Sequence, residues 1–330
     1  MPKTLLCDLI DGKPQLILRE LPAGEPGPGE VRYRVHAIGL NRADILYMQG
    51  GHYTPTVYPV RIGYEACGIV DAVGPGVAEF KIGDRVSAIP FGDPKYCVAG
   101  ESAITPARFL APWLAGHSPE EAAATWMQYM TAYFPLREVS TLAAGDAVLI
   151  TAASSSAGLG AIQLAKYLGA RVIATTRTDE KRDFLMRAGA DFVVVTDAGN
   201  VAARILESTE NRGVRVVYDA VAGPFMGQYA DAVARKAQIF VYGALGGAAT
   251  IESPILPLIR KGATIELYSL INYLQEPDAV DRGREFIWSA IRTGAFRPII
   301  DRVFDLEQAI EAYAYMAAGM QKGKIVLRCR

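Results

Sequence analysis

Residues 148–160 read VLITAASSSAGLG, and residues 161–166 continue as AIQLAK. The apolar start predicts a buried strand, the small residues predict a tight turn, and the continuation predicts a helix that begins at that turn. This order suits a dinucleotide, because the free N–H groups and the dipole of a helix N-terminus attract a pyrophosphate. Small residues let the backbone approach the anion, and Gly158 suits close packing of helix on strand. An ordinary strand–helix turn without a ligand is the alternative interpretation.

A second short β-branched run, VIAT at 172–175, completes a strand–helix–strand unit. The alternation of strand and helix continues to about residue 265. A doubly wound parallel sheet is therefore the predicted core of this part of the chain. The strands are expected at residues 147–151, 171–175, 191–195, 214–219 and 237–242.

The first third of the chain has a different pattern. Short β-like segments such as 15–20 and 30–38 alternate with Gly/Pro-rich turns, which is typical of a small barrel-like β-domain. After the parallel sheet, we expect a helix at 281–294, a strand at 302–304, a helix at 306–318 and a closing strand at 323–327. This tail is too short for a separate domain, so we expect it to return and complete the N-terminal one. The predicted division is 1–122, 123–265 and 266–330.

Composition limits the class of protein. The 330 residues are 51% hydrophobic, and 34 basic against 35 acidic residues give a net charge of −1. Such a balance offers no support for nucleic-acid or anionic-membrane binding. The four cysteines form no C-x-x-C pair, and the N-terminus lacks a signal-peptide pattern. The expectation is a cytoplasmic protein with free thiols.

Several further motifs carry a family resemblance: GLNRAD at 39–44, GYEACG at 63–68, FKIGDRV at 80–86, AAATWMQYMTAY at 122–133 and GKIVL at 323–327. Together with the turn at 151–160, they make the chain resemble the medium-chain dehydrogenase/reductase superfamily, and within it the zinc-independent quinone oxidoreductase-like group. The resemblance covers essentially the full length. It implies an α/β fold in which a GroES-like β-rich catalytic domain carries an inserted Rossmann domain, with the active site between them.

The resemblance also bears on metal. Zinc members of the superfamily hold the ion with a Cys, a His and a third ligand, and the matching positions here are Asn41, Tyr64 and about Met127. None of these residues is a good ligand for zinc, which takes thiolate, imidazole or carboxylate. His36 and His117 are expected to be structural or exposed, and His52 lies near the expected substrate loop. We therefore expect no metal.

The choice of nicotinamide rests on the end of the second strand. Enzymes specific for NAD place an acid there for the ribose 2′-OH, whereas this chain reads Thr176-Arg177, with Lys181 one helical turn later. Arginine can bind a 2′-phosphate bidentately, so NADPH is the expected cofactor. Asp179 is the one contrary residue, and its position fits a helix cap. A solvated basic helix start is the alternative.

Other cofactor contacts follow from the resemblance and from the ends of later strands. One departure is that Ser155 and Ser156 stand where related reductases have two glycines; their hydroxyls can donate to phosphate, but their Cβ atoms restrict close approach. The expected cofactor-binding residues are Thr131, Ser155, Ser156, Ala157, Gly158, Leu159, Thr176, Arg177, Lys181, Thr196, Val221, Gly243, Ala244, Leu245, Ser269 and Lys324.

The expected catalytic residues are Tyr53, Asn41 and Tyr64. By resemblance, Tyr53 matches the acid of related enoyl reductases, with Tyr47 and Tyr64 as rival donors and Asn41 as a holder of the substrate carbonyl. An apolar wall for planar substrates is the alternative role for Tyr53. The loops at 47–62 and 268–280 are expected to set specificity, together with Tyr58, Phe91, Tyr273 and Leu274.

The predicted function is NADPH-dependent transfer of hydride, without metal, to quinones or α,β-unsaturated carbonyl compounds, whose conjugation spreads the developing charge. The alternatives are a zinc-dependent alcohol dehydrogenase, a biosynthetic enoyl reductase and a non-catalytic NADPH-binding protein. The expected partners are a small-molecule substrate and a second copy of the chain, paired through strands near 237–270.

Overall fold

The structure is a computed structural model that describes residues 1–52, 54–247 and 250–329. The chain forms two compact units. Unit 1 comprises Met1–Met127 and Arg297–Arg330, and unit 2 comprises Gln128–Phe296. Unit 2 is continuous in sequence and interrupts unit 1.

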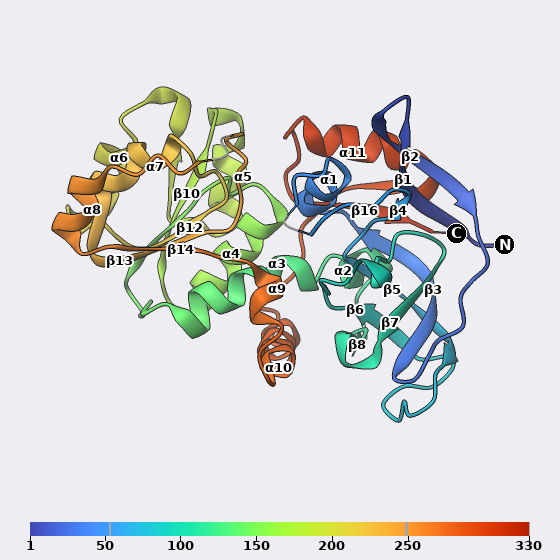
Figure 1. The fold of residues 1–330 in the computed structure, drawn as a ribbon. Helices are drawn as coiled ribbons and strands as arrows, with labels where there is room; N and C mark the ends of the chain where they lie inside the picture. The colour runs from blue at the N-terminus through green and yellow to red at the C-terminus, as the bar shows by residue number, and fades with distance from the viewer. Residues whose placement is uncertain (53, 248–249, 330) are drawn as a thin grey trace. The chain divides into compact units, whose positions relative to one another are not determined.

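Unit 2 contains a parallel sheet, as the sequence predicted (Figure 1). The strand order is β11-β10-β9-β12-β13-β14, so the order reverses between β9 and β12, as in a Rossmann fold. Val148, Leu149 and Ile150 of β9 are fully buried, which explains the continuous apolar run in the sequence. The strands are β9 (Ala147–Ile150), β10 (Arg171–Thr176), β11 (Phe192–Val195), β12 (Val214–Asp219), β13 (Val233–Val241) and β14 (Thr264–Leu267).

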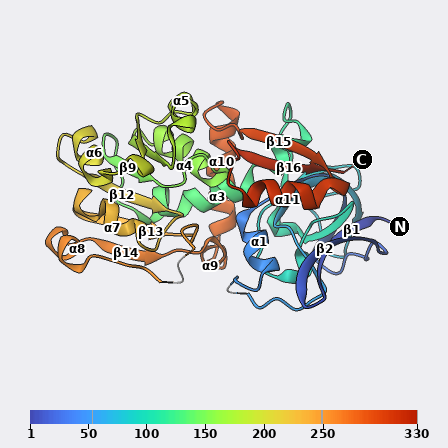
Figure 2. The ribbon, with the colours of Figure 1, turned by 90° about the horizontal axis from the view of Figure 1, so that it is seen from above.

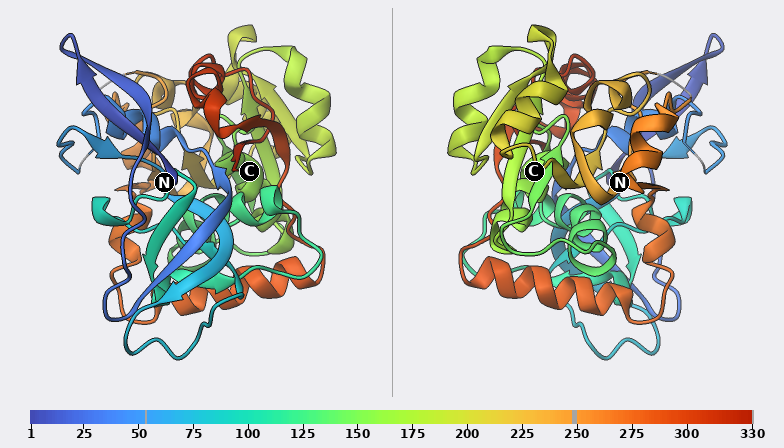
Figure 3. Two further views of the ribbon diagram at one scale, coloured as in Figure 1. Left: turned by 90° about the vertical axis from the view of Figure 1, so that its right-hand side faces the viewer. Right: turned by 90° about the vertical axis from the view of Figure 1, so that its left-hand side faces the viewer.

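Helices cover both faces of this sheet (Figure 3). The helices that unit 2 contains, with α3 crossing its boundary, are α3 (Trp126–Tyr133), α4 (Ser156–Tyr167), α5 (Arg182–Arg187), α6 (Val201–Ser208), α7 (Phe225–Tyr229), α8 (Ile255–Lys261), α9 (Leu270–Tyr273) and α10 (Ala279–Arg292). A π-helical turn, Phe134–Val139, follows α3.

Residues 266–296, expected in the return segment, pack within unit 2. The Phe286 ring of α10 lies 5.1 Å from the Tyr133 ring and 5.7 Å from the Tyr167 ring. Gly283 brings α10 so close to α3 that a Cβ there would meet the Met130 sulfur at 2.6 Å. Aromatic packing on α3 and α4 therefore holds α10 in unit 2, and the compact units divide at 127/128 and 296/297 instead of 122/123 and 265/266.

Unit 1 is built on a mixed sheet of order β15-β16-β3-β5-β6-β8, with β7 also paired to β3. A smaller antiparallel sheet has the order β2-β1-β4. The strands are β1 (Lys3–Ile10), β2 (Lys13–Glu20), β3 (Glu30–Gly39), β4 (Val60–Arg61), β5 (Glu65–Val73), β6 (Arg85–Ala88), β7 (Ser102–Pro106), β8 (Leu110–Pro112), β15 (Ile300–Asp305) and β16 (Lys324–Arg328).

The C-terminal strand closes the sheet of unit 1. β16 pairs antiparallel with β3 through Val326↔Gly39 and Leu327↔Ile38, and parallel with β15. The helices of this unit are α1 (Arg42–Met48), α2 (Pro119–Ala123) and α11 (Ala309–Ala317), and α11 lies along β15 and β16 (Figure 2). No helix within the described ranges has the length and apolar character needed to cross a membrane.

Gly158 gives a test of the turn that precedes α4. A Cβ at this position would lie 2.6 Å from the Ala153 carbonyl oxygen, so we expect Gly158→Ala to destabilise the protein by about 1–3 kcal/mol. Gly227, inside α7, has no neighbour within 4 Å of a built Cβ, and Gly227→Ala is expected to be neutral or to stabilise by up to about 1 kcal/mol. Urea unfolding of both variants measures the difference in stability. Equal midpoints would contradict the close contact between Gly158 and the Ala153 backbone.

Candidate functional site

The turn between β9 and α4 is formed without glycine at its sharpest point. Ala152 adopts a left-handed conformation with φ 46°, and its carbonyl accepts a hydrogen bond from the Ser155 N–H at 3.0 Å. The Ser155 hydroxyl caps α4 by accepting from the Gly158 N–H at 3.1 Å. A hydroxyl that accepts in this way can still donate its own proton. Ser155 therefore acts as a helix cap and keeps a donor at the helix N-terminus.

Gly158 and Gly160 permit two close contacts of α4. Gly158 packs against the backbone of Ala153, in the turn rather than in the strand, and Gly160 packs against Gln128 of α3, where a Cβ would lie 3.1 Å from the carbonyl oxygen. The start of the helix is thus held directly against the turn. Such placement presents the helix N-terminus at the carboxyl edge of the sheet.

Asp219, at the end of β12, joins the two strands at which the sheet order reverses. Its Oδ1 accepts hydrogen bonds at 2.8 Å from the Thr151 hydroxyl, which follows β9, and from the Val221 N–H. The Tyr229 hydroxyl donates to Oδ2 at 2.8 Å, and the Thr151 oxygen accepts from the Ala220 N–H. This buried network fixes the crevice where doubly wound sheets bind nucleotides. The sequence placed Asp219 at a strand end beside the expected ligand crevice, but it did not predict this network of hydrogen bonds.

The basic residues after β10 have different environments. The Lys181 ammonium donates to the Ser154 hydroxyl at 3.1 Å and so reaches the turn before α4. Arg182 is engaged by Asp179 at 2.5 Å and by the Val193 carbonyl at 3.0 Å. Arg177 is exposed and pairs with no carboxylate of the described residues. Arg177 and Lys181, the second of which contacts the turn itself, are therefore two cations beside this edge.

Most other expected cofactor residues of unit 2 follow the carboxyl ends of its strands. Thr176 is the last residue of β10 and Thr196 follows β11. Val221 comes after β12, Gly243, Ala244 and Leu245 come after β13, and Ser269 precedes α9. Thr131 differs, because it is a buried residue of α3.

Unit 1 contains a buried polar cluster around Glu65. The Lys324 ammonium forms an ion pair with Glu65 Oε1 and donates to Asn41 Oδ1 at 2.7 Å, and neither charged side chain is more than 1% exposed. The Met127 N–H donates to Glu65 Oε2 at 2.9 Å. Lys324, expected as a cofactor contact, is therefore enclosed and committed to protein partners.

Asn41 is held by the same cluster. Its amide donates to the Gly39 carbonyl at 3.1 Å and to Glu65 Oε1 at 3.2 Å. Both amide N–H bonds are therefore used by protein acceptors. The sequence analysis expected Asn41 to hold a substrate carbonyl, but neither N–H is left for this role. Asn41 instead fixes the start of α1.

The positions that match zinc ligands were tested against this geometry. Asn41 Oδ1 accepts from an ammonium, and Met127 contributes its N–H to a carboxylate. Within the described ranges, no group of three or more His, Cys, Asp or Glu residues could hold a metal ion. The donors at Asn41, Tyr64 and Met127 do not fit zinc.

A cluster of aromatic side chains lies at the C-terminal end of α1 and consists of Tyr47, His52 and Tyr64. We call it the aromatic corner. The Thr54 N–H donates to His52 Nδ1 at 3.1 Å, and the Tyr64 hydroxyl lies 3.4 Å from His52 Nε2. The Tyr47 ring meets the imidazole edge-on, with centroids 5.8 Å apart. Tyr53, the expected acid, lies outside the described residues.

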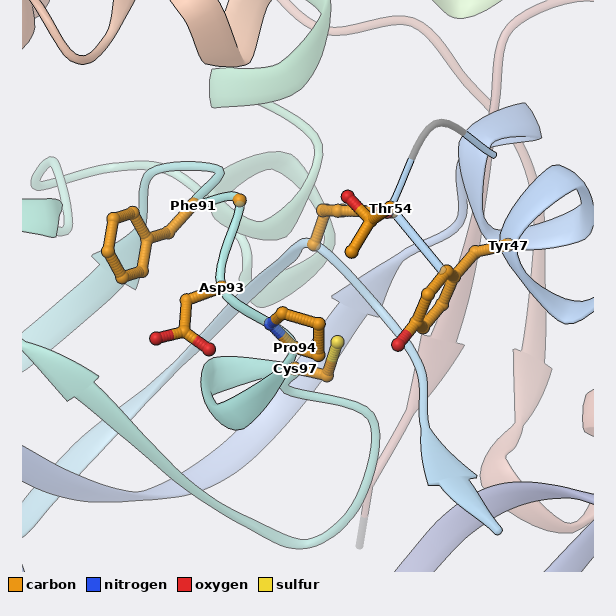
Figure 4. A pocket seen from close by; sticks show the side chains of 8 residues that line it. Tyr47, Thr54, Phe91, Asp93, Pro94 and Cys97 are labelled. Atoms are coloured by element: carbon orange, nitrogen blue, oxygen red, sulfur yellow. The ribbon is translucent and has the colours of Figure 1, made fainter. Parts of the chain in front are cut away.

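A small pocket adjoins this corner. In Figure 4, the Tyr47 hydroxyl and the Cys97 sulfur point toward each other across it. Burial raises the pKa of the Cys97 thiol to about 12, so this group is a neutral thiol at physiological pH. The pocket is lined by Tyr47, Thr54, Tyr64, Phe91, Gly92, Asp93, Pro94 and Cys97.

The remaining specificity candidates are distributed over both units. Tyr58 donates to the Met48 carbonyl at 2.6 Å, and Phe91 stacks on Phe109 with centroids 4.0 Å apart. In unit 2, Tyr273 donates to Glu266 at 2.5 Å, and Leu274 is buried at the end of α9. His36 packs edge-on against Trp113, and the backbone carbonyl of His117 accepts from the same indole.

Comparison with known proteins identifies the class. Residues 27–142 match the family model described as alcohol dehydrogenase GroES-like domain, and residues 157–284 match that described as zinc-binding dehydrogenase. A quinone oxidoreductase of Pseudomonas aeruginosa is 32% identical over 99% of both chains, and a 2-haloacrylate reductase of a Burkholderia species is 30% identical over 96% of both.

Solved structures agree. The Escherichia coli quinone oxidoreductase, complexed with NADPH, matches with a TM-score of 0.89 at 28% identity, covering 99% of this chain and all of that one. The chain therefore belongs to the medium-chain dehydrogenase/reductase superfamily, in its quinone oxidoreductase-like group. It is an oxidoreductase with the predicted GroES-like and Rossmann architecture.

The Glu65–Lys324 pair gives a prediction for stability. Lys324→Met leaves a buried carboxylate without its cation, and we expect it to destabilise by about 3–5 kcal/mol. The double variant Lys324→Met/Glu65→Gln removes both charges and is expected to recover part of this loss. Lys166→Met, which breaks the exposed pair with Asp191, is the control and should cost less than about 1 kcal/mol. Chemical unfolding measures all three; similar losses in Lys324→Met and Lys166→Met would refute the argument.

Asp44 gives a prediction for pH. Its carboxyl is fully buried and accepts from the Asn41 N–H and the Tyr313 hydroxyl. Burial outweighs these bonds and raises the pKa of Asp44 from 3.8 to about 7. The folded state thus binds the proton more tightly than the unfolded state, so this contribution to stability is fully present below about pH 4 and lost as pH rises through about 7.

Asp44→Asn should remove that dependence. We expect the difference in melting temperature between pH 5 and pH 8 to be smaller in Asp44→Asn than in the parent protein. Asp84→Asn, at a partly exposed acid that binds the Lys81 N–H, is the control and should leave the difference unchanged. An unaltered pH profile in Asp44→Asn would show that the buried carboxyl does not titrate in this range.

Proposed function

We propose that this protein uses NADPH to reduce quinones or α,β-unsaturated carbonyl compounds, and that the reaction needs no metal. The observation that carries the proposal is the carboxyl edge of the unit 2 sheet, where the capped N-terminus of α4 lies beside Lys181. The names of the relatives support the reaction class, since they include quinone oxidoreductases and a 2-haloacrylate reductase.

The residues at this edge fit a phosphorylated dinucleotide. The Ser155 hydroxyl and the N-terminus of α4 offer donors to a pyrophosphate. The hydrogen bonds of Asp219 hold β9 and β12 together at the point where the strand order reverses, which is where such sheets bind nucleotides. Arg177 follows β10 without an acidic partner among the described residues, and Lys181 reaches Ser154. An exposed guanidinium and an ammonium at this place favour a 2′-phosphate over a free 2′-hydroxyl.

When bound, NADPH would supply the hydride. The protein must then supply a proton and accommodate the acceptor. Tyr64 lines the pocket, and its hydroxyl lies beside an imidazole. Tyr53 stays a candidate for the same task. A phenol of ordinary pKa near 10 can protonate an enolate, which is a stronger base.

The acceptor must be conjugated for a chemical reason. Without a metal to polarise an isolated carbonyl, the negative charge that follows hydride addition needs another site. Quinones and enones spread this charge over the conjugated system. A saturated ketone cannot, so it should react poorly in this protein.

The test combines acceptors with changes to the cofactor site. The purified protein is assayed with NADPH and NADH against a simple quinone, an enone and a saturated ketone. We expect NADPH oxidation with the quinone or the enone, and little with the ketone. In Arg177→Ala/Lys181→Ala, the KM for NADPH should rise roughly 10- to 100-fold, because charge-assisted hydrogen bonds are lost, while NADH values stay unchanged.

Arg187→Ala supplies the matched control, since this exposed arginine lies on α5 but faces no proposed contact. It should behave as the parent protein. Equal use of NADH and NADPH by the parent protein would overturn the cofactor assignment. Binding of NADPH without turnover on any conjugated acceptor would favour a non-catalytic role or a dedicated biosynthetic substrate.

A further inference from the structure

We propose that His52 is a positioning residue that directs the Tyr64 proton toward the α-carbon of a conjugated carbonyl substrate. The inference rests on the proposed function and selects one donor for it. Its structural basis is the chain of contacts from the Thr54 backbone through the imidazole to the phenol of Tyr64.

The first contact fixes the tautomer of His52. A backbone N–H can only donate, so the 3.1 Å bond from Thr54 requires a lone pair on His52 Nδ1. The proton of the neutral imidazole is therefore on Nε2. Burial lowers the pKa of His52, which keeps the ring in this neutral form.

The second contact sets the polarity of Tyr64. His52 Nε2–H faces the Tyr64 oxygen, and the two atoms lie 3.4 Å apart. In this contact the phenol oxygen accepts from the imidazole, so the proton of the phenol is not the one shared with His52. The arrangement therefore makes Tyr64 a donor, and the same Nε2–H stabilises the tyrosinate left after donation.

The loop that carries His52 is tied to α1. The Thr56 hydroxyl donates to the Tyr47 carbonyl at 2.5 Å, and the Tyr58 hydroxyl donates to the Met48 carbonyl at 2.6 Å. The edge-on packing of Tyr47 on the imidazole adds a steric limit to its rotation. Tyr64 itself is 8% exposed and precedes Glu65, whose carboxylate is fixed by Lys324. Both members of the pair are thus held by independent contacts.

The step balances as follows. Hydride addition to the β-carbon leaves an enolate, a C–H bond forms at the α-carbon as the Tyr64 O–H bond breaks, and the tyrosinate regains its proton from water. Reduction of a quinone differs, because both protons go to oxygen atoms, which exchange protons with water rapidly. A positioned acid should therefore matter for enones and little for quinones.

The experiment compares the two acceptors in three variants of the NADPH-loaded protein. We expect Tyr64→Phe and His52→Leu to lower kcat for the enone roughly 10- to 100-fold, with quinone kcat within about twofold of the parent. His52→Gln should restore much of the enone rate, because its amide oxygen can accept from Thr54 while its N–H donates to Tyr64. His117→Leu, at a histidine elsewhere in unit 1, is the control and should leave both rates unchanged.

Protonation at carbon offers a second readout. In D2O, the parent protein should place deuterium on one face of the α-carbon, and Tyr64→Phe should lose this facial preference. Unchanged enone kinetics and facial preference in His52→Leu would overturn the inference while leaving the proposed function intact. Failure of the parent protein with both acceptors would instead overturn the proposed function. Equal losses with quinone and enone would show a structural role for His52.

Discussion

The buried pair of Glu65 and Lys324 is the interaction on which unit 1 depends. Its partners are 259 positions apart in the sequence, and they join β5 to the closing strand β16. Neither charge could be enclosed alone, because removing an ion from water costs several kcal/mol unless its partner and hydrogen bonds are in place. The same pair orients Asn41 and receives the Met127 N–H. Pairing of β16 in the sheet and positioning of Asn41 at the start of α1 therefore depend on the same ion pair.

Unit 2 relies on a corresponding arrangement that contains no cation. Asp219 gathers donors from the residues after β9, from its own turn and from Tyr229, so its buried carboxylate is satisfied by hydrogen bonds instead of a cation. These hydrogen bonds join β9 and β12, the two strands at which the sheet divides into its halves. They leave the N-terminus of α4 and the cations after β10 at one edge, which is what recognition of a dinucleotide requires.

The sequence indicated the parts of the fold that follow from local pattern. The buried parallel strands were predicted because both of their faces are apolar, which gives a continuous apolar run in the sequence. β14 was not predicted, because it is short and lacks such a run; its Ile265 and Leu267 are exposed. A helix was predicted at 281–294 and is observed as α10 at Ala279–Arg292, but its membership in unit 2 depends on Phe286, whose aromatic partners are distant in sequence. The Glu65 cluster escaped prediction for the same reason. The sequence shows that residue 324 is a lysine, but only the fold shows that it pairs with Glu65.

The interruption of unit 1 by unit 2 has a consequence for biosynthesis. During synthesis β3 emerges early, but its neighbour β16 is made only after the whole of unit 2. At about 5–20 residues per second, this delay is roughly 15–60 s. Unit 2, being continuous, can fold on the ribosome in that interval, while one edge of the β3 sheet waits unpaired. Synthesis of β16, rather than of the N-terminal strands, would then complete the first unit, and a chaperone able to shield a strand edge would act in this window.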